Sequence, residues 1–194
     1  MQVIGLTGFA GSGKSTVANY LVEAHGFTRL SFAAPLKKML RTLNPIIDIT
    51  DNEGGSEYGE VRVGELFKLG WTEAQIKEDP NMGAEYRRLL QVLGTDCIRA
   101  VDEHFWVNAA TEQMTDDNGK YVFDDVRFPN EAEVIIELNS WGLWNVSRPG
   151  FEAVNGHASE QHAGNMNESL TITNARTVEM LHTDIDAALA LVEV

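Results

Sequence analysis

The sequence is poor in cysteine and in basic residues, and each shortage excludes a class of protein. Cys97 is the only cysteine, so the chain cannot form an internal disulfide and offers no CxxC metal pair, which fits a reducing compartment. The chain has 15 Lys and Arg against 29 Asp and Glu, a formal net charge of −14. Because sequence-independent binding to nucleic acid or to anionic membranes depends on basic residues, we expect neither as a partner.

Long apolar runs are also missing. No stretch approaches the roughly 18 residues that cross a bilayer, and neither a basic nor a long apolar segment precedes "QVIGLTG" at residues 2–8. We therefore expect a cytoplasmic protein. A length of 194 residues with 43% hydrophobic content suffices for one domain with a full core, so residues 1–194 are expected to form a single domain.

Five apolar segments alternate with helical patterns along the chain. The expected strands are 2–8, 28–33, 120–128, 143–148 and 169–174. Helical spacing follows the first strand and recurs at 35–43, about 84–104, 130–142 and 175–192. This alternation predicts an α/β fold of three layers, in which a five-stranded parallel sheet has helices on both faces and binds ligands beyond the carboxyl ends of its strands. Residues 44–83 are polar and are expected to be an insertion outside the core, with one short helix near "TEAQIKE".

A phosphate-binding motif lies between the first strand and the first helix. Gly8, Gly13, Lys14 and Ser15 match G-x-x-x-x-G-K-[ST] within "GLTGFAGSGKST". Glycines let backbone N–H groups turn toward phosphate oxygens, the lysine reaches the terminal phosphates, and the Ser15 hydroxyl is expected to ligate Mg²⁺. A glycine-rich turn with a solvated lysine is the alternative. The ATP-binding residues expected in this loop are Gly11, Ser12, Gly13, Lys14, Ser15 and Thr16.

The motif by itself fits guanine-nucleotide switches, motors and kinases. The segment "TITNARTVE" lacks the N-K-x-D of guanine switches, and the chain is smaller than the modules of ring-forming motors. These observations favour a small-molecule phosphotransferase. A regulatory or DNA-packaging NTPase is the alternative from another class.

Acidic and basic residues follow one another in "DDVRFPNEA", at the end of the third expected strand. In phosphoryl transfer a protein mainly positions and neutralises phosphates, so an acid near Mg²⁺ and an arginine on a phosphate are expected there. Strand alternation through 120–128 places Asp125 and Arg127 on one side and Asp124 on the other. We predict that Asp125 joins Ser15 at the metal and that Lys14, Asp125 and Arg127 are catalytic. An ion pair that caps the next helix is the alternative.

The expected helix 84–104 gathers polar residues on one side. At 100° per residue two sets fall on opposite faces: Leu90, Leu93, Cys97 and Val101, and Arg88, Gln91, Thr95 and Arg99. Arginine forks fit phosphate and glutamine fits a base edge, although plain solvation is the more common explanation of such a face.

Taken together, these segments resemble the phage deoxynucleoside monophosphate kinases, a branch of the nucleoside monophosphate kinase group of P-loop proteins. The resemblance rests on "GFAGSGKST", "SFAAPLKKML", "YRRLLQVLGTD", "FWV", "DDVRFPNEA" and "HASEQHAG", in this order, and is weakest over 44–83. It implies that the γ-phosphate of ATP is transferred, with Mg²⁺, to a deoxynucleoside monophosphate, which yields the diphosphate and ADP. It also implies a mobile monophosphate-binding region at about 34–104, a lid at about 148–168, and the host-cell cytoplasm as the location of a phage-encoded chain.

The resemblance further implies roles for individual residues. Arg127 would grip phosphate, and the other expected substrate-binding residues are Lys37, Arg87, Arg88 and Gln91. The family has an arginine four residues before the glutamine, which selects Arg87, whereas the helical wheel favours Arg88, and both are kept. Arg148, in the lid, and Asn174, where the base rests in this fold, complete the expected ATP site.

Several properties stay open at the level of sequence. A related kinase of dephospho-coenzyme A or of a sugar acid is the alternative within enzymes. The expected partners are small-molecule nucleotides, but the accepted bases, the choice between deoxyribose and ribose, and the formation of a homodimer are not fixed. The roles of His157, Ser159 and Glu160 are open as well.

Overall fold

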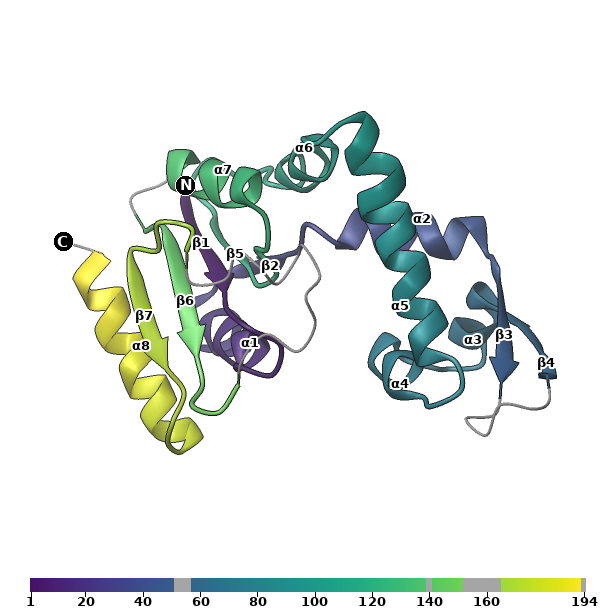
Figure 1. Cartoon of the computed structure of the whole chain (residues 1–194). Helices are drawn as coiled ribbons and strands as arrows, with labels where there is room; N and C mark the ends of the chain where they lie inside the picture. The colour runs from purple at the N-terminus through teal and green to yellow at the C-terminus, as the bar shows by residue number, and fades with distance from the viewer. Residues whose placement is uncertain (51–56, 139–140, 152–164, 193–194) are drawn as a thin grey trace. The chain divides into compact units, whose positions relative to one another are not determined.

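A computed structural model describes residues 1–50, 57–138, 141–151 and 165–192. The chain divides into two compact units. Unit 1 consists of Met1–Phe32 and Val107–Val194, and unit 2 consists of Ala33–Trp106. Figure 1 shows the helices and strands of both units. Within the described ranges, no helix combines the length and the apolar character needed to cross a bilayer.

Unit 1 is built on a five-stranded parallel sheet, as the sequence predicts. From edge to edge its strands are β2 (Thr28–Leu30), β5 (Lys120–Phe123), β1 (Gln2–Thr7), β6 (Leu143–Ser147) and β7 (Leu170–Thr173). Every neighbouring pair is parallel. The central strand β1 is covered on both faces, which explains why its sequence is an almost unbroken apolar run.

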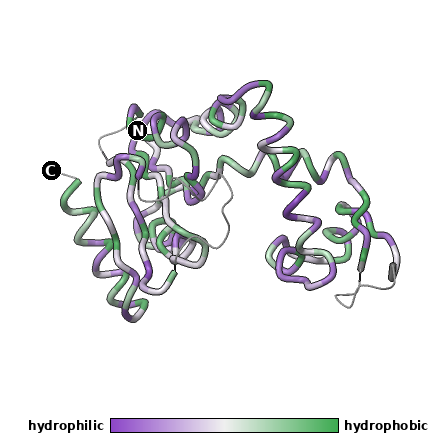
Figure 2. The backbone as a smooth tube through the Cα atoms, viewed as in Figure 1, coloured by the Kyte–Doolittle hydropathy of each residue, from purple (hydrophilic) through white to green (hydrophobic). Residues whose placement is uncertain are grey.

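Helices cover both faces of this sheet and complete the three predicted layers (Figure 1). On one face lie α1 (Lys14–His25) and α8 (Val178–Val192), whose buried side chains include Leu21 and Ile185. On the other face lie α6 (Phe105–Thr111) and α7 (Pro129–Leu138), which bury Val107 and Ile135. Successive β1 residues alternate between the two cores, since Val3 belongs to the second and Ile4 to the first. Figure 2 shows hydrophobic and hydrophilic residues mixed along α8.

Two of the strands end three or more residues before the end that the sequence predicts. β5 ends at Phe123 rather than at residue 128, and β2 ends at Leu30 rather than at residue 33. Side-chain alternation therefore stops before Asp124. Because all five strands are parallel, the residues after β1, β5, β6 and β7 meet at one edge of the sheet, and this edge carries the site.

Unit 2 contains more regular structure than the prediction of a polar insertion allows. It consists of α2 (Ala34–Leu43), β3 (Ile46–Thr50), β4 (Glu57–Arg62), α3 (Val63–Lys68), α4 (Glu73–Glu78), α5 (Gly83–Gln91) and the π-helix η1 (Val92–Arg99). β3 and β4 form an antiparallel pair. Its core includes Ile47, Val63, Ile76 and Tyr86, all with no exposed surface. The expectation of one short helix between residues 44 and 83 is wrong because each of these segments contributes only a few apolar residues among many polar ones.

The predicted single helix 84–104 is wrong in its second half. Regular α-helix ends at Gln91, and the backbone continues as the π-helix η1, in which N–H groups bond five residues back. A spacing of 100° per residue no longer holds there, and Cys97 and Val101 are exposed rather than on a core face with Leu90. Within η1 the Gly94 carbonyl accepts a hydrogen bond from Trp106 Nε1 at 2.9 Å.

Candidate active site

The phosphate loop can form only with glycine at two of its positions. Gly8 and Gly13 have φ angles of 135° and 105°. A Cβ atom on Gly8 would lie 2.2 Å from the Val146 carbonyl oxygen, and one on Gly13 would lie 2.4 Å from Asn174 Nδ2. The loop is therefore pressed against the ends of β6 and β7, with Gly13 as the N-cap of α1.

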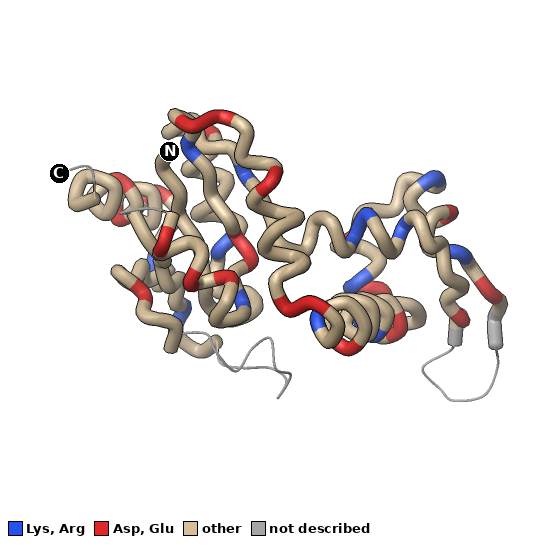
Figure 3. The backbone as a smooth tube through the Cα atoms, turned by 90° about the horizontal axis from the view of Figure 1, so that it is seen from above, with Lys and Arg blue, Asp and Glu red and all other residues tan. Residues whose placement is uncertain are grey.

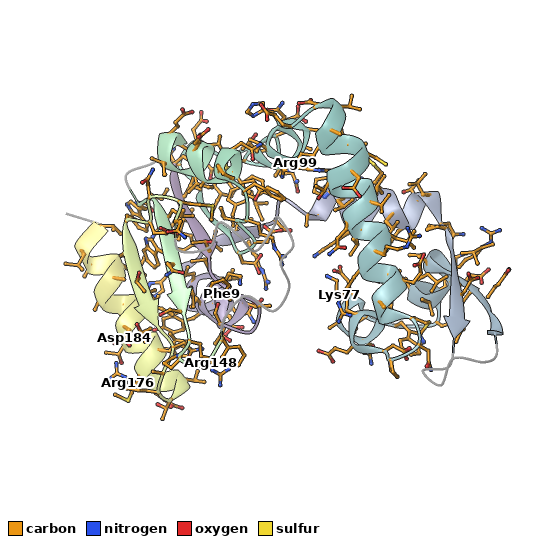
Figure 4. The ribbon with its side chains drawn as sticks, viewed as in Figure 1. Phe9, Lys77, Arg99, Arg148, Arg176 and Asp184 are labelled. Carbon is orange, nitrogen blue, oxygen red and sulfur yellow. The ribbon has the colours of Figure 1, made fainter. Side chains whose placement is uncertain are left out.

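Three residues after β6 and β7 support the loop from outside. Asn174 Nδ2 donates a hydrogen bond to the Ser12 carbonyl at 3.0 Å. The Phe151 ring packs on Gly11, where an added Cβ would approach Phe151 Cε1 to 2.6 Å, and the Arg148 guanidinium lies 4.8 Å from the centre of that ring. Figure 4 shows Arg148 at the same end of the sheet as Phe9 of the loop. Of the two ATP residues predicted outside the loop, Asn174 therefore contacts the main chain of the loop directly, whereas Arg148 lies next to it through Phe151.

Lys14 is folded back onto the loop. Its Nζ donates hydrogen bonds to the carbonyl oxygens of Gly8 at 2.6 Å and Phe9 at 2.9 Å. The charge is therefore held within the curl of the loop. Ser12 Oγ is buried there and has no hydrogen-bond partner among the described residues, so the loop offers an unsatisfied hydroxyl to a polar ligand.

Asp124, and not the predicted Asp125, faces Ser15. The Ser15 Oγ lies 3.5 Å from Asp124 Oδ2, and Arg29 forms an ion pair with the same carboxylate. Asp125 instead accepts hydrogen bonds from Ser31 Oγ at 2.6 Å and from the Phe32 backbone N–H at 3.0 Å. We expected Asp125 beside Ser15 because the prediction extended strand alternation beyond Phe123, where β5 ends.

Arg127 is exposed, and its backbone rather than its side chain joins the helix cap. Its N–H donates to Glu131 Oε2 at 2.8 Å, and the N–H of Phe128 donates to the same oxygen at 3.1 Å. Glu131 is buried and lies in the first turn of α7. The capping considered as an alternative thus belongs to Glu131, and the role of the Arg127 side chain stays a prediction.

In unit 2 an open cavity of about 360 Å³ lies along the surface of α2. It is lined by Ala34, Lys37, Lys38, Arg41 and Thr42. Basic residues follow one another along this helix (Figure 3). The predicted substrate residue Lys37 is therefore one of three cationic side chains around one cavity.

Glu73 of α4 partly balances this charge. Its carboxylate lies 3.4 Å from Lys37 Nζ and also pairs with Lys77, labelled in Figure 4. Burial would raise the pKa of Glu73, but the hydrogen bonds and positive charges of Lys77 and Lys37 outweigh burial and hold it below the ordinary value. Burial, with a smaller contribution from Glu73, raises the pKa of Tyr86 to about 12, so this phenol stays protonated.

The structure distinguishes the two arginines of α5. The Arg88 guanidinium donates two hydrogen bonds to the Glu85 carboxylate, from Nε to Oε2 and from Nη2 to Oε1, both at 2.7 Å. A hydrogen bond from Arg88 lowers the pKa of Glu85. Arg87 is exposed and lies one turn before the exposed Gln91, within the regular part of the helix. Arg87 thus has the spacing that the resemblance requires, while Arg88 is engaged by a neighbour.

The model of the family described as deoxynucleotide monophosphate kinase matches residues 73–185, more than half of the chain. The chain belongs to this family. A protein of Acanthamoeba polyphaga mimivirus described as a deoxynucleotide monophosphate kinase is 32% identical over 95% of this chain and 94% of its own length. The deoxynucleoside-5'-monophosphate kinase of Escherichia phage T5 is 25% identical, with 71% and 72% covered.

Among solved structures, the dephospho-CoA kinase of Campylobacter jejuni is similar in fold. The match has a TM-score of 0.50 and 12% identity, and covers 98% of this chain and 96% of that one. Family membership makes the chain an ATP-dependent kinase of deoxynucleoside monophosphates. This confirms both the family and the activity that the resemblance implied.

A magnesium ion would find suitable donors at the end of the loop. Where the structure describes the chain, no group of three or more His, Cys, Asp or Glu forms a metal centre. Ser15 and Asp124 nevertheless supply a hydroxyl and a carboxylate, and Mg²⁺ in kinases is held by one or two such oxygens together with substrate phosphates and waters. The donor set therefore fits this ion.

Sequence reasoning missed Arg29, Arg41 and Phe151. An arginine inside "TRLSF", a strand of a mostly buried sheet, was a usable signal for Arg29. Arg41 lies one turn after Lys37 on α2, so its place beside the cavity could have been found from helical spacing. The lid predicted for 148–168 lies mostly outside the described residues, as do His157, Ser159 and Glu160.

Proposed function

We propose that the two units divide the work of the kinase. Unit 1 binds ATP through residues 8–16, with Mg²⁺ at Ser15 and Asp124, and unit 2 binds the deoxynucleoside monophosphate along α2 and α5. The observation that carries this proposal is the Ser15–Asp124 pair, 3.5 Å apart at the end of a loop built for phosphate. The cationic cavity on α2 supports the assignment of the acceptor.

On the donor side the loop neutralises the triphosphate. Its backbone N–H groups and the N-terminus of α1 attract phosphate oxygens. When ATP binds, Lys14 gives up its hydrogen bonds to the carbonyls of Gly8 and Phe9 and donates to phosphate oxygens instead. A phosphate oxygen carries more negative charge than a carbonyl, so the exchange is favourable. Mg²⁺ bound at Ser15 and Asp124 would neutralise further charge on the donor phosphates. Asn174 holds the loop in shape through the Ser12 carbonyl.

On the acceptor side the dianionic phosphate meets Lys37, Lys38 and Arg41. Glu73 does not cancel this charge, because its carboxylate is shared with Lys77. Arg87 and Gln91, one turn apart on α5, are proposed for the remaining contacts, with the amide reading a base edge. We assign no acceptor contact to Arg88, because its guanidinium is paired with Glu85.

The reaction needs little acid–base chemistry. A phosphate oxygen of the acceptor forms a bond to the γ-phosphorus of ATP, and the bond from this phosphorus to the β-γ bridging oxygen breaks. The products are the deoxynucleoside diphosphate and ADP. We assign to Lys14 and Arg127 the stabilisation of the charge on the transferred group, for which an arginine contributes about 10³ to 10⁵ in rate in related chemistry.

Titration of ATP and acceptor separately tests the division. Lys14→Ala is expected to abolish turnover, whereas Lys37→Ala and Arg41→Ala are each expected to raise the acceptor KM about tenfold and leave the KM for ATP unchanged. Glu73 keeps Lys77 as a partner in Lys37→Ala, so the fold should persist. Lys68→Ala, an exposed lysine of unit 2 that does not line the cavity, is the matched control. An unchanged acceptor KM in both cavity variants would contradict the assignment.

A further inference from the structure

The Arg29 side chain contacts both oxygens proposed for the metal. From β2, its Nη2 forms the ion pair with Asp124 Oδ2 and lies 3.4 Å from Ser15 Oγ. Its Nη1 donates a hydrogen bond to Asn19 Oδ1 at 2.9 Å. The guanidinium therefore spans from the end of β5 to the outer surface of α1.

The burial of Asp124 explains why a cation is needed there. The Asp124 side chain is 10% exposed and the Arg29 side chain is 39% exposed. A carboxylate removed from water is costly unless a positive charge or several donors satisfy it. Arg29 supplies this charge, and the planar guanidinium of an arginine can satisfy two acceptors in different directions, here Asp124 and Asn19.

We propose that Arg29 is an internal counter-cation that holds the metal site in shape and is displaced when Mg²⁺ arrives with the nucleotide. This inference rests on the proposed function, which assigns the metal to Ser15 and Asp124. The guanidinium and a metal ion are both cations, so they repel one another when they are held at the same carboxylate oxygen, Asp124 Oδ2. Arg29 and the metal therefore compete for the same atom.

Competition has a measurable consequence. An apparent dissociation constant rises when the binding-competent state is only a fraction of the population, here the state in which Arg29 has left Asp124. The Arg29 side chain is partly exposed, and its Nη1 is hydrogen-bonded to Asn19 Oδ1. The guanidinium can therefore leave the carboxylate without losing every partner. Removing its charge should therefore tighten metal binding while weakening the ligand-free fold.

The test measures Mn²⁺ in place of Mg²⁺, by the loss of the free-ion signal in electron paramagnetic resonance. A non-hydrolysable ATP analogue is kept fully bound by a molar excess of the protein, so that no free analogue chelates Mn²⁺. Arg29→Gln is expected to lower the apparent Kd for Mn²⁺ about threefold to tenfold, and Arg29→Lys, which keeps the charge, to stay within about twofold of wild type. Arg176→Gln is the matched control, because Arg176 pairs with Asp184 of α8 at 2.8 Å and touches neither metal oxygen (Figure 4). Unchanged or weaker Mn²⁺ binding by Arg29→Gln would overturn the inference.

A second measurement does not depend on the folding of a variant. In ¹⁵N-labelled wild-type protein, the Arg29 guanidinium resonances are expected to shift when Mg²⁺ is added to the complex with the ATP analogue. Arg29 chemical shifts that stay unchanged when Mg²⁺ is added would overturn the proposal. Asp124→Asn separates the two levels of the argument: if it leaves Mn²⁺ binding unchanged, the proposed metal site is wrong. If it weakens binding but Arg29→Gln does not tighten it, only the competition is wrong.

Discussion

Ser15 Oγ and Asp124 Oδ2 lie 3.5 Å apart although 109 positions of sequence separate them. The hydroxyl begins α1 and the carboxylate follows β5, two elements of the same unit. Donor binding and metal binding are thus assigned to one edge of one sheet. The acid at this edge is the first of the two adjacent aspartates.

The two aspartates should behave differently when each is changed to asparagine. Asp124→Asn is expected to reduce metal-dependent turnover by at least about a hundredfold with a fold that remains intact. Asp125→Asn removes one charge-assisted acceptor from Ser31 and Phe32, so it should lower the free energy of unfolding by about 1 to 3 kcal/mol and keep most of the turnover of the folded protein. Turnover at several Mg²⁺ concentrations and denaturant unfolding measure both. The reverse pattern would restore the prediction from sequence.

The Asn174 side chain decides between support of the loop and recognition of a base. Its amide donates a hydrogen bond to the Ser12 carbonyl, so Asn174→Ala should make the loop less rigid. The affinities for ATP and for GTP should then fall by the same factor. The expected loss is about threefold to tenfold, as for one hydrogen bond. Competition binding with the two triphosphates measures this factor. A change in the preference between them would instead indicate contact with the base.

Arg87 and Arg88 offer a matched pair on one helix. Arg87→Ala is expected to raise the acceptor KM about tenfold to a hundredfold, the value of one charge-assisted hydrogen bond. Arg88→Ala should leave the acceptor KM within about twofold, because Glu85 already holds that guanidinium. Steady-state titrations with one deoxynucleoside monophosphate at saturating ATP compare them. Equal effects, or a larger effect at Arg88, would favour the helical wheel.

The lowered pKa of Glu73 implies that the protein loses part of its free energy of unfolding in acid. Its pKa is lower in the folded protein than in the unfolded chain, so its stabilisation is complete above the unfolded value of about 4.3 and is lost as the pH falls through the folded value. Glu73→Gln should therefore cost about 1 kcal/mol near neutral pH, and this difference should vanish in acid. Unfolding of wild type, Glu73→Gln and the exposed control Glu65→Gln at several pH values measures it. A difference that persists at low pH would show that the ion pairs are not its source.

The sequence predicted those parts of the molecule whose signals are local. The glycine loop, the five strands of the sheet and the stop of α1 at Gly26 each follow from a few adjacent residues. Asp124 could not be chosen over Asp125, because the choice depends on where β5 ends. Arg29 reaches Asp124 across 95 positions, a contact that no local pattern records.

Unit 2 was predicted less well for a similar reason. Its core is assembled from β3, α3, α4 and α5, and each contributes a few side chains such as Ile47 and Ile76. The π-helix η1 also makes tertiary contacts, since Leu36 packs on Gly94 and Trp106 Nε1 donates a hydrogen bond to the Gly94 carbonyl. Helical periodicity alone gives no sign of either contact.

The most direct test of the account is the dependence of ATP consumption on the acceptor. ADP formation is followed with Mg-ATP and a panel of ribonucleoside and deoxyribonucleoside monophosphates, with dephospho-coenzyme A, a sugar acid and single-stranded DNA as alternatives. We expect ADP to appear only when a deoxynucleoside monophosphate is present, and in an amount equal to that of the diphosphate formed. ATP hydrolysis at the same rate without an acceptor, or its stimulation by DNA, would contradict it.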